Sequence, residues 1–508
     1  MTWSGSGNNA AAELSIAGRL AAGLRLTHIM PTAGQALLAT TQDKEEVMAN
    51  WYARKIEELK DGFKGELLLP SDGAYDSARK IWNAMIDKRP AFIARCATPS
   101  DVVRGVTFAR DNGFVLAVRG GGHNIAGNAL CDDGLVLDLS QMKAARVDPA
   151  GRRVTIEGGA TLADLDAATQ AHGLATPVGI NSTTGIGGLT LGGGFGWLSR
   201  KYGMTVDNLA SAEVVTAAGV VVRASSTEHP DLFWALRGGG GNFGVVTRFE
   251  FRLHPVGPEV LSGLIVYPIA EAKAVLQQYR DFLAKAPDEL AVWTVLRKAP
   301  PLPFLPERVH GKEMIALALL YAGDPKQGEP LIEPLRKFGT PLGEHVGVQP
   351  YVAWQQAFDP LLTAGARNYW KSHNFSTLQD GLFDVVVGYV GKLPSPQCEI
   401  FFGAIGGATT RPAPDSAAYP HRDAQFVMNF HGRWADPADD TRCIGWARDF
   451  FTATAPFASG GAYVNFLTAD EGDRVRSAYG PNYERLAQVK RKYDPENLFR
   501  MNQNIEPA

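Results

Sequence analysis

The sequence predicts an α+β protein with more than one structural unit, and three observations support this fold class. The chain has 508 residues, a length that corresponds to about two to four units at about 100–200 residues per domain. Short predicted strands and helices alternate up to about residue 257, whereas longer amphipathic helices and aromatic-rich extended segments fill about residues 258–460. Glycine accounts for 55 of the 508 residues, above the usual ~7%, and it clusters where predicted strands end.

The first part of the chain is predicted to form short elements in a clear order. We expect a poorly ordered extension over residues 1–45 and a helix over residues 46–60. Thr98 and Asp101 signal the start of a helix that ends at Gly113, because threonine can cap free N–H groups and glycine tolerates a left-handed turn. Further strands are predicted at 114–118, 135–139 and 153–157, a helix at 162–172, and a strand pair at 211–223 that turns at Ala218-Gly219.

The later part of the chain carries longer helical and extended patterns. Residues 270–283 form a predicted amphipathic helix, and the proline-rich residues 300–306 are predicted to be a loop. The aromatic-rich residues 425–434 are predicted to be extended, and residues 481–490 form a final helix with one apolar face.

Composition excludes several classes of function. The chain has 50 Lys and Arg against 53 Asp and Glu, a formal net charge of −3, which argues against nucleic acid or an acidic membrane as the main partner. No run of about 18 apolar residues predicts a bilayer span. The four cysteines lack the spacing of a zinc site, so we expect no metal and free thiols in a reducing, cytoplasmic compartment. They are Cys96, Cys131, Cys398 and Cys443.

Three glycine clusters, at residues 119–124, 179–196 and 238–244, predict a binding site for an anionic group. Glycine allows backbone to reach positive φ or to approach a ligand closely, and successive free N–H groups suit a pyrophosphate. Gly239, Gly241 and Gly244 fit the GxGxxG pattern of a nicotinamide-binding unit, but that pattern requires a following helix. Residues 245–253 alternate as a strand instead, so the nicotinamide interpretation fails.

Four motifs together resemble the berberine-bridge-enzyme-like, FAD-linked branch of the vanillyl-alcohol-oxidase family. The motifs are Arg119-Gly-Gly-Gly-His-Asn124, the run from Gly187 to Gly196, the run from Gly238 to Thr247, and the ending from Tyr493 to Ile505. The resemblance extends from about residue 70 to the C-terminus. Residues 78–96 are similar to bacterial members of the 6-hydroxy-D-nicotine oxidase type.

The resemblance implies a PCMH-type FAD-binding domain of two subdomains and a substrate domain with an antiparallel sheet flanked by helices. We expect the FAD-binding domain at residues 46–257, the substrate-binding domain at 258–460, and a C-terminal segment at 461–508 that completes the FAD domain. The implied partners are a small-molecule substrate and O2, and a homodimer is compatible with the family.

His123 stands where the family's histidine bonds covalently to the flavin 8α carbon. Many relatives carry a second, cysteine tether in the stretch that matches residues 179–185, where this chain has Asn181, Ser182 and Thr183. We therefore expect one covalent bond, through His123. The residues expected to bind FAD are Arg119, Gly120, Gly121, Gly122, His123, Asn124, Gly127, Gly179, Thr183, Gly185, Gly187, Gly188, Leu189, Gly193, Gly194, Gly196, Gly244, Val245, Val246, Asn502 and Gln503.

The resemblance implies hydride transfer from a small alcohol or amine to flavin N5, followed by reoxidation, so the chain is expected to be an oxidase. Tyr463 matches the first position of the family's Tyr-x-Asn-Tyr/His pattern, and Phe466 replaces the polar fourth residue. If residues 425–434 form a strand, Asn429, His431 and Arg433 share a face, and His431 becomes a second candidate for the catalytic base. Two alternatives stay open: a dehydrogenase of the same fold with another electron acceptor, and a catalytically silent flavin-binding protein.

Overall fold

The computed structural model describes residue 51 and residues 53–508. The predicted extension at residues 1–45 and the first residues of the predicted helix at 46–60 lie outside this part of the chain; residues 53–60 are helical. The predicted α+β class is confirmed: the described residues form four sheets and the helices that cover them. No helix among them is long and apolar enough to cross a membrane.

The first half of the molecule contains three sheets, the smallest of which is an antiparallel pair of β7 (Leu174–Ala175) and β11 (His254–Pro255). The four-stranded sheet has the order β1-β2-β4-β3 and is mostly parallel, with strands Glu66–Leu68, Phe92–Arg95, Leu135–Asp138 and Leu116–Arg119. The five-stranded sheet has the order β5-β6-β10-β8-β9, with antiparallel strands Ala145–Asp148, Arg153–Glu157, Val245–Arg252, Leu209–Val215 and Val221–Ser225. Strand β10 follows the third glycine cluster directly, as the sequence predicts.

The helix predicted from Thr98 to Gly113 begins and ends where its signals predict, whereas the helix predicted at residues 162–172 begins at Leu162 but ends at Gln170. Helix α4 (Pro99–Asn112) has a capping box between Thr98 and Asp101, and Gly113 ends it at φ 70°. Helix α5 (Leu162–Gln170) begins with a second capping box, between Thr161 and Asp164. The shorter helices are α3 (Tyr75–Ala78), α6 (Ile186–Leu191), α7 (Ser199–Tyr202), α8 (Thr205–Asn208) and α9 (Pro230–Leu236).

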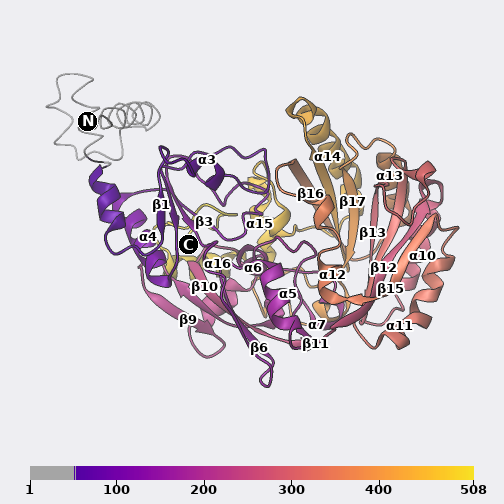
Figure 1. The fold of residues 1–508 in the computed structure, drawn as a ribbon, viewed down its shortest axis with the longest axis horizontal. Helices are drawn as coiled ribbons and strands as arrows, with labels where there is room; N and C mark the ends of the chain where they lie inside the picture. The colour runs from indigo at the N-terminus through magenta and orange to yellow at the C-terminus, as the bar shows by residue number, and fades with distance from the viewer. Residues whose placement is uncertain (1–50, 52) are drawn as a thin grey trace, which may run out of the picture.

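The second half is built on a seven-stranded antiparallel sheet of order β15-β12-β14-β13-β17-β18-β16. Its strands, in that order, are Gly343–Pro350, Glu259–Pro268, Glu313–Tyr321, Leu290–Lys298, Glu399–Ala404, Phe426–Trp434 and Arg367–Phe375. Helices α10 (Ala272–Leu283), α11 (Pro325–Ile332), α13 (Asp380–Val390) and α14 (Asp440–Thr454) lie on its outer side (Figure 1).

The two faces of this sheet have different partners because side chains alternate along each strand. Phe430 of β18 packs on Phe450 of α14, with ring centroids 4.5 Å apart. Its neighbour His431 points the other way and lines a cavity against the first half. Trp293, Val295 and Arg297 of β13 alternate onto the same cavity face. One face of the sheet therefore packs against helices in the hydrophobic core, and the other face lines the cavity.

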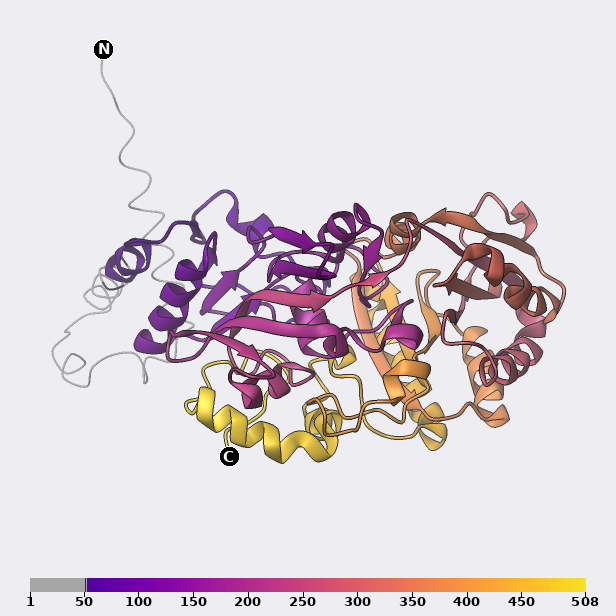
Figure 2. The ribbon, with the colours of Figure 1, turned by 90° about the horizontal axis from the view of Figure 1, so that it is seen from below.

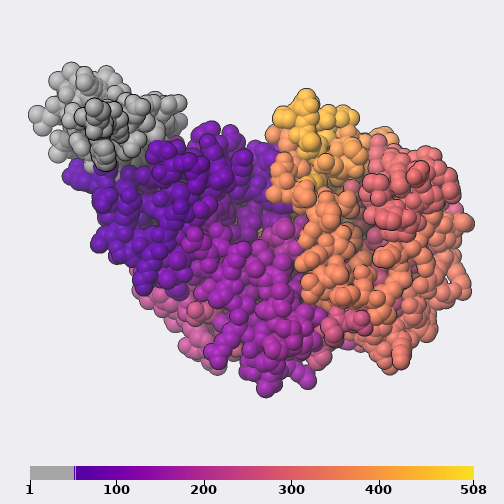
Figure 3. Space-filling model, viewed as in Figure 1, coloured from indigo at the N-terminus to yellow at the C-terminus, as the bar shows by residue number. Residues whose placement is uncertain are grey.

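The C-terminal segment returns to the first half of the molecule. Helix α15 (Val475–Tyr479) and helix α16 (Tyr483–Tyr493) lie against one side of that half, along the lower edge of the view in Figure 2. Lys490 is fully buried and bonds to Asp494 at 2.6 Å and to the Asn242 carbonyl at 2.8 Å. The two halves meet along a long boundary (Figure 3), and the predicted domain limits near residues 257 and 460 stay predictions.

A buried polar pair crosses this boundary. Gln355, at the end of helix α12 (Tyr351–Gln355), donates a 3.1 Å hydrogen bond to Asp166 of α5 and a 3.3 Å bond to the Gly179 carbonyl. Asp166 Oδ1 and Gln355 Oε1 have no partner among the described residues. Burial raises the pKa of Asp166 to about 7, against the bond from Gln355. When Asp166 is protonated, its O–H group can donate a hydrogen bond to Gln355 Oε1, and Asp166 Oδ1 and Gln355 Oε1 would then each have a partner.

We predict that this pair makes stability depend on pH. The folded pKa of Asp166, about 7, lies above the ~3.9 of an unfolded chain, so its contribution is complete below about pH 4 and is lost as the pH rises through 7. Asp166→Asn keeps an amide partner for Gln355 at every pH. Urea unfolding at pH 5 and pH 8 should show the variant more stable than the parent at pH 8 by about 1–3 kcal/mol, with a smaller difference at pH 5. An equal difference at both pH values would contradict this assignment.

Candidate active site

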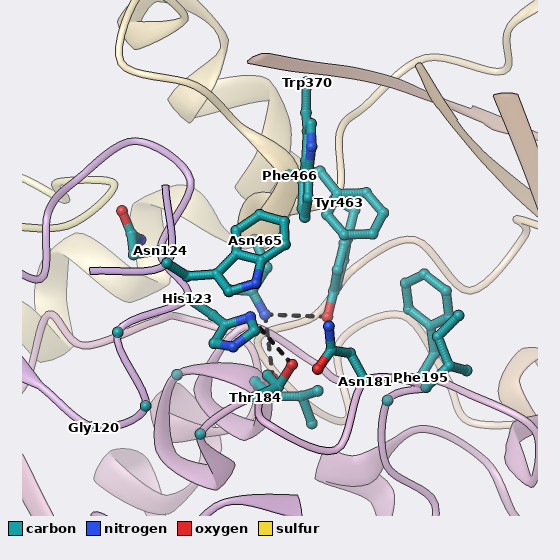
Figure 4. A pocket seen from close by; sticks show the side chains of 18 of the residues that line it. Gly120, His123, Asn124, Asn181, Thr184, Phe195, Trp370, Tyr463, Asn465 and Phe466 are labelled. Atoms are coloured by element: carbon teal, nitrogen blue, oxygen red, sulfur yellow. Dashed lines mark hydrogen bonds between the residues drawn. The ribbon is translucent and has the colours of Figure 1, made fainter. Parts of the chain in front are cut away.

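A cavity of about 370 Å³ lies between the two halves. Its floor comes from the glycine clusters of the first half, and its roof comes from the inner face of the seven-stranded sheet (Figure 4). The segment after Ala462 contributes Tyr463, Asn465 and Phe466 to the wall. Segments that are far apart in the sequence therefore form the walls of one cavity.

Two glycine loops touch at the floor of this cavity. A Cβ atom added to Gly121 would lie 2.3 Å from the backbone nitrogen of Gly185, and one added to Gly185 would lie 2.3 Å from that of Gly121. No side chain fits at either position. The backbone N–H groups of residues 120–123 have no partner among the described residues, so they are free to bind an anionic group.

The chemistry of this floor fits the FAD that the sequence predicts. Gly188 lines the cavity, and a Cβ built on it meets no atom within 4 Å. The empty space over Gly188 and the free N–H groups at residues 120–123 suit a cofactor that carries a pyrophosphate. Apolar side chains of Leu139, Val245 and Val246 extend the same wall.

His123 stands at the end of the first glycine loop and faces the cavity. Its Nε2 lies 2.9 Å from Thr183 Oγ1 and its Nδ1 lies 3.4 Å from Thr184 Oγ1. The indole of Trp82 stacks on the imidazole, with centroids 5.1 Å apart and 21° between the planes. Burial lowers the pKa of His123 to about 4, so the imidazole is neutral at neutral pH.

Tyr463 places a neutral hydroxyl in the wall. This oxygen accepts a 3.0 Å bond from the Gly194 N–H and a 3.1 Å bond from Asn465 Nδ2. Burial raises the pKa of Tyr463 to about 12, against these two bonds. The phenol therefore stays protonated, and its O–H proton is available to an acceptor in the cavity.

A second polar group faces the cavity from the sheet. Arg297 Nη1 donates to Glu399 Oε2 at 2.6 Å, and His431 Nδ1 lies 3.3 Å from Glu399 Oε1. Although burial alone raises the pKa of Glu399, the charge of Arg297 and the bond to His431 lower it to about 2. Burial lowers the pKa of His431, and Glu399 opposes this only in part. Glu399 is thus a carboxylate beside a neutral imidazole.

Both nitrogens of His431 face acceptors. Its Nε2 lies 3.1 Å from Asn368 Oδ1, and that amide is oriented by its own bond to the Ala366 carbonyl and by a contact from Arg433. Trp370 packs edge-on against the His431 ring, with centroids 4.6 Å apart. A neutral imidazole has a single N–H, so His431 donates only one of these two hydrogen bonds, and the lone pair of its other nitrogen faces a protein oxygen and not the cavity.

Most of the predicted site residues lie on the cavity wall. His123, Tyr463 and His431 line it, as do Gly120, Gly121, Gly122, Asn124, Gly179, Gly185, Gly187, Gly188, Leu189, Gly244, Val245, Val246, Asn502 and Gln503. Arg119, Gly127, Thr183, Gly193, Gly194 and Gly196 are not on the wall.

The predicted residues that lie off the wall support it from behind. Arg119 pairs with the buried Asp138, and Gly127 and Gly196 pack closely on Ile86 and on the Val178 carbonyl. Gly194 donates its N–H to Tyr463. Of the residues on the predicted strand face, His431 lines the cavity but Asn429 and Arg433 do not.

Sequence reasoning missed several wall residues, chiefly Trp82, Trp293, Arg297, Glu399 and Phe401. Arg297 and Glu399 sit on different strands whose pairing places them opposite each other. The alternation within residues 290–298 was the available signal, since it puts Trp293, Val295 and Arg297 on one face.

Comparisons with known proteins identify an FAD-binding domain and a family. A family model described as "FAD binding domain" matches residues 90–225, and one described as "Berberine and berberine like" matches residues 462–506. An FAD-linked oxidoreductase of Dictyostelium discoideum is 32% identical over 457 residues, which cover 89% of this chain and 97% of that one.

Solved structures show the same fold. The crystal structure of 6-hydroxy-D-nicotine oxidase from Arthrobacter nicotinovorans has a TM-score of 0.79 and 31% identity, covering 88% of this chain and 98% of that one. The glucooligosaccharide oxidase from Acremonium strictum, described with a 6-S-cysteinyl, 8α-N1-histidyl FAD, has a TM-score of 0.79 and 24% identity, covering 89% and 99%.

We predict that Gly188→Leu abolishes FAD binding without unfolding the protein. The new side chain would enter the cavity, where nothing lies within 4 Å of the added Cβ. Gly388→Leu is the matched control, because Gly388 lies in helix α13, is exposed, and also has nothing within 4 Å of an added Cβ. Flavin absorbance per chain should fall to background in the first variant and be unchanged in the second. A Gly188→Leu protein with full flavin content would show that the cofactor lies elsewhere.

Proposed function

The chain belongs to the family of FAD-linked oxidoreductases with a berberine-like C-terminal segment, and on that premise we propose that it is an oxidase tethered to FAD through His123 alone. It would oxidise a small amine or alcohol and pass the electrons to O2. The observation that carries the proposal is the position of a neutral, stacked His123 on the wall of the glycine-lined cavity.

The tether follows from the state of His123. A neutral imidazole is a nucleophile, whereas an imidazolium is not. A pKa of about 4 keeps the ring neutral at physiological pH, and the stacking of Trp82 holds its plane. Asn181 and Ser182 offer no thiol for a second bond, in contrast to the cysteinyl linkage described for the glucooligosaccharide oxidase.

FAD, when bound, supplies the redox chemistry by accepting a hydride from the substrate. The residues of this chain have to orient the substrate and exclude water. Trp82, Trp293, Trp370, Phe401 and Phe466 supply aromatic wall, which suits an apolar substrate body. Arg297 and Glu399 supply a charged pair at the sheet.

The polar groups favour an amine over an alcohol. Oxidation of an alcohol calls for a base to take the hydroxyl proton, whereas a neutral amine can give up hydride without one. Tyr463 is protonated, with a pKa of about 12, and both nitrogens of His431 face protein oxygens and not the cavity. Glu399 is ionised, but Arg297 neutralises it. Tyr463 is therefore better placed as a donor to the substrate than as a base.

The proposed function is tested by anaerobic reduction of the purified holoprotein with a panel of secondary and tertiary amines and matched alcohols. An amine should bleach the oxidised flavin absorbance, and admission of air should restore it with one hydrogen peroxide per cycle. If an artificial electron acceptor restores the flavin absorbance and air does not, the protein is a dehydrogenase and not an oxidase. A flavin that no substrate bleaches would contradict catalysis by this site.

We predict that Tyr463→Phe lowers kcat/KM by roughly 10-fold, the loss of one hydrogen bond of about 1.4 kcal/mol to the bound substrate. The shape of the pH profile should not change, because a donor with a pKa near 12 does not titrate in the working range. A loss of about 1,000-fold or more, with a missing ionisation in the profile, would instead identify Tyr463 as the base.

A further inference from the structure

The loop before helix α6 meets His123 through one well-defined hydrogen bond. Thr183 Oγ1 lies 2.9 Å from His123 Nε2. A hydroxyl can donate or accept, and a neutral imidazole has one N–H and one lone pair. The other contacts of Thr183 decide between these roles.

Asn181 fixes the direction of this bond. The Thr183 backbone N–H, which can only donate, lies 3.0 Å from Asn181 Oδ1, so that atom is an acceptor. Thr183 Oγ1 lies 2.7 Å from the same Asn181 Oδ1, and a contact between these two oxygens requires the hydroxyl proton. Since Thr183 has only one such proton, its oxygen must accept from His123.

We propose that Thr183, oriented by Asn181, holds His123 in the Nε2–H tautomer and so selects Nδ1 as the atom that bonds to the flavin. This inference rests on the proposed tether at His123. The ring is neutral and carries a single N–H, so donation from Nε2 leaves the lone pair on Nδ1. Thr184 Oγ1, at 3.4 Å from Nδ1, is too distant for a strong competing bond.

The bond-forming step balances with dioxygen as the oxidant. The Nδ1 lone pair forms the C–N bond to the 8α carbon, and that carbon loses one hydrogen as a proton, leaving the C–H electron pair on the ring system. Nε2 then releases its own proton. Two electrons and two protons are thus transferred in total, and dioxygen takes them to become hydrogen peroxide. Thr183 is a positioning residue in this step.

Asp359 holds the same loop from the other half of the molecule. It begins a short turn (Asp359–Leu361) and accepts two hydrogen bonds from Ser182, one of 3.0 Å from the backbone N–H and one from the hydroxyl. Ser182 lies between Asn181 and Thr183. One carboxylate of the second half therefore holds the loop whose Thr183 contacts His123.

The test uses the full chain produced without flavin, then mixed with FAD in air. Covalent incorporation is followed by flavin fluorescence in the denatured protein band, and the linked imidazole nitrogen is identified by NMR of the flavin peptide. The wild type should react to give only the Nδ1 product. Thr183→Val cannot accept the bond, and we expect at least a 10-fold slower reaction and a mixture of Nδ1 and Nε2 products. Thr183→Ser keeps the hydroxyl and should restore rate and product.

Two further measurements separate the outcomes. Because Thr183 lies off the cavity wall, contrary to its predicted contact with FAD, Thr183→Val should keep the non-covalent FAD affinity of the wild type in fluorescence quenching, which excludes misfolding. Asp359→Ala should slow the reaction without changing the product. A wild type linked through Nε2, or a Thr183→Val protein that reacts like the wild type, would overturn the inference while leaving the tether intact. A wild type that binds FAD and never forms the bond would overturn the tether and this inference together.

Discussion

The contact of two glycine loops, at Gly121 and Gly185, is the constraint on which the site depends. Their backbones approach so closely that a Cβ on either residue would overlap the other loop. The first loop carries the free N–H groups and ends near His123, and the second carries Thr183 and Thr184 directly before Gly185. The contact thus brings the proposed nucleophile against the hydroxyl that orients it, and leaves room above Gly188 for a large cofactor.

The sheet of the second half completes this arrangement because its two faces have different partners. One face is held by α10, α13 and α14, and the other presents Trp293, Arg297, Glu399, Trp370 and His431 to the cavity. A charged pair in an apolar chamber costs desolvation energy. Here Arg297 Nη1 lies 2.6 Å from Glu399 Oε2, and His431 makes a further contact with the Glu399 carboxylate. Burial lowers the pKa of His431, and Glu399 opposes this only in part, so His431 is a poor base.

Much of the first half could be predicted from the sequence because its signals are local. Thr98 with Asp101 caps α4, Gly113 ends it, and Gly219 turns β8 into β9. The strand after Gly244 excluded a nicotinamide-binding unit, and β10 confirmed that reasoning. The sequence alone also contained the motifs that indicate the FAD-linked family, and it singled out His123, which lies on the cavity wall in the structure.

The substrate side was much less predictable, because it depends on strand pairing across long sequence distances. Glu399 meets Arg297 only through the register of β13 with β17, and Asp359 reaches Ser182 across 177 residues.

The covalent bond between His123 and FAD is the central claim. It is tested most directly by flavin fluorescence in the protein band after denaturation in SDS, for the wild type and His123→Ala. We predict a fluorescent band in the wild type and none in the variant. A yellow wild-type protein that releases all its flavin on denaturation would contradict the central claim.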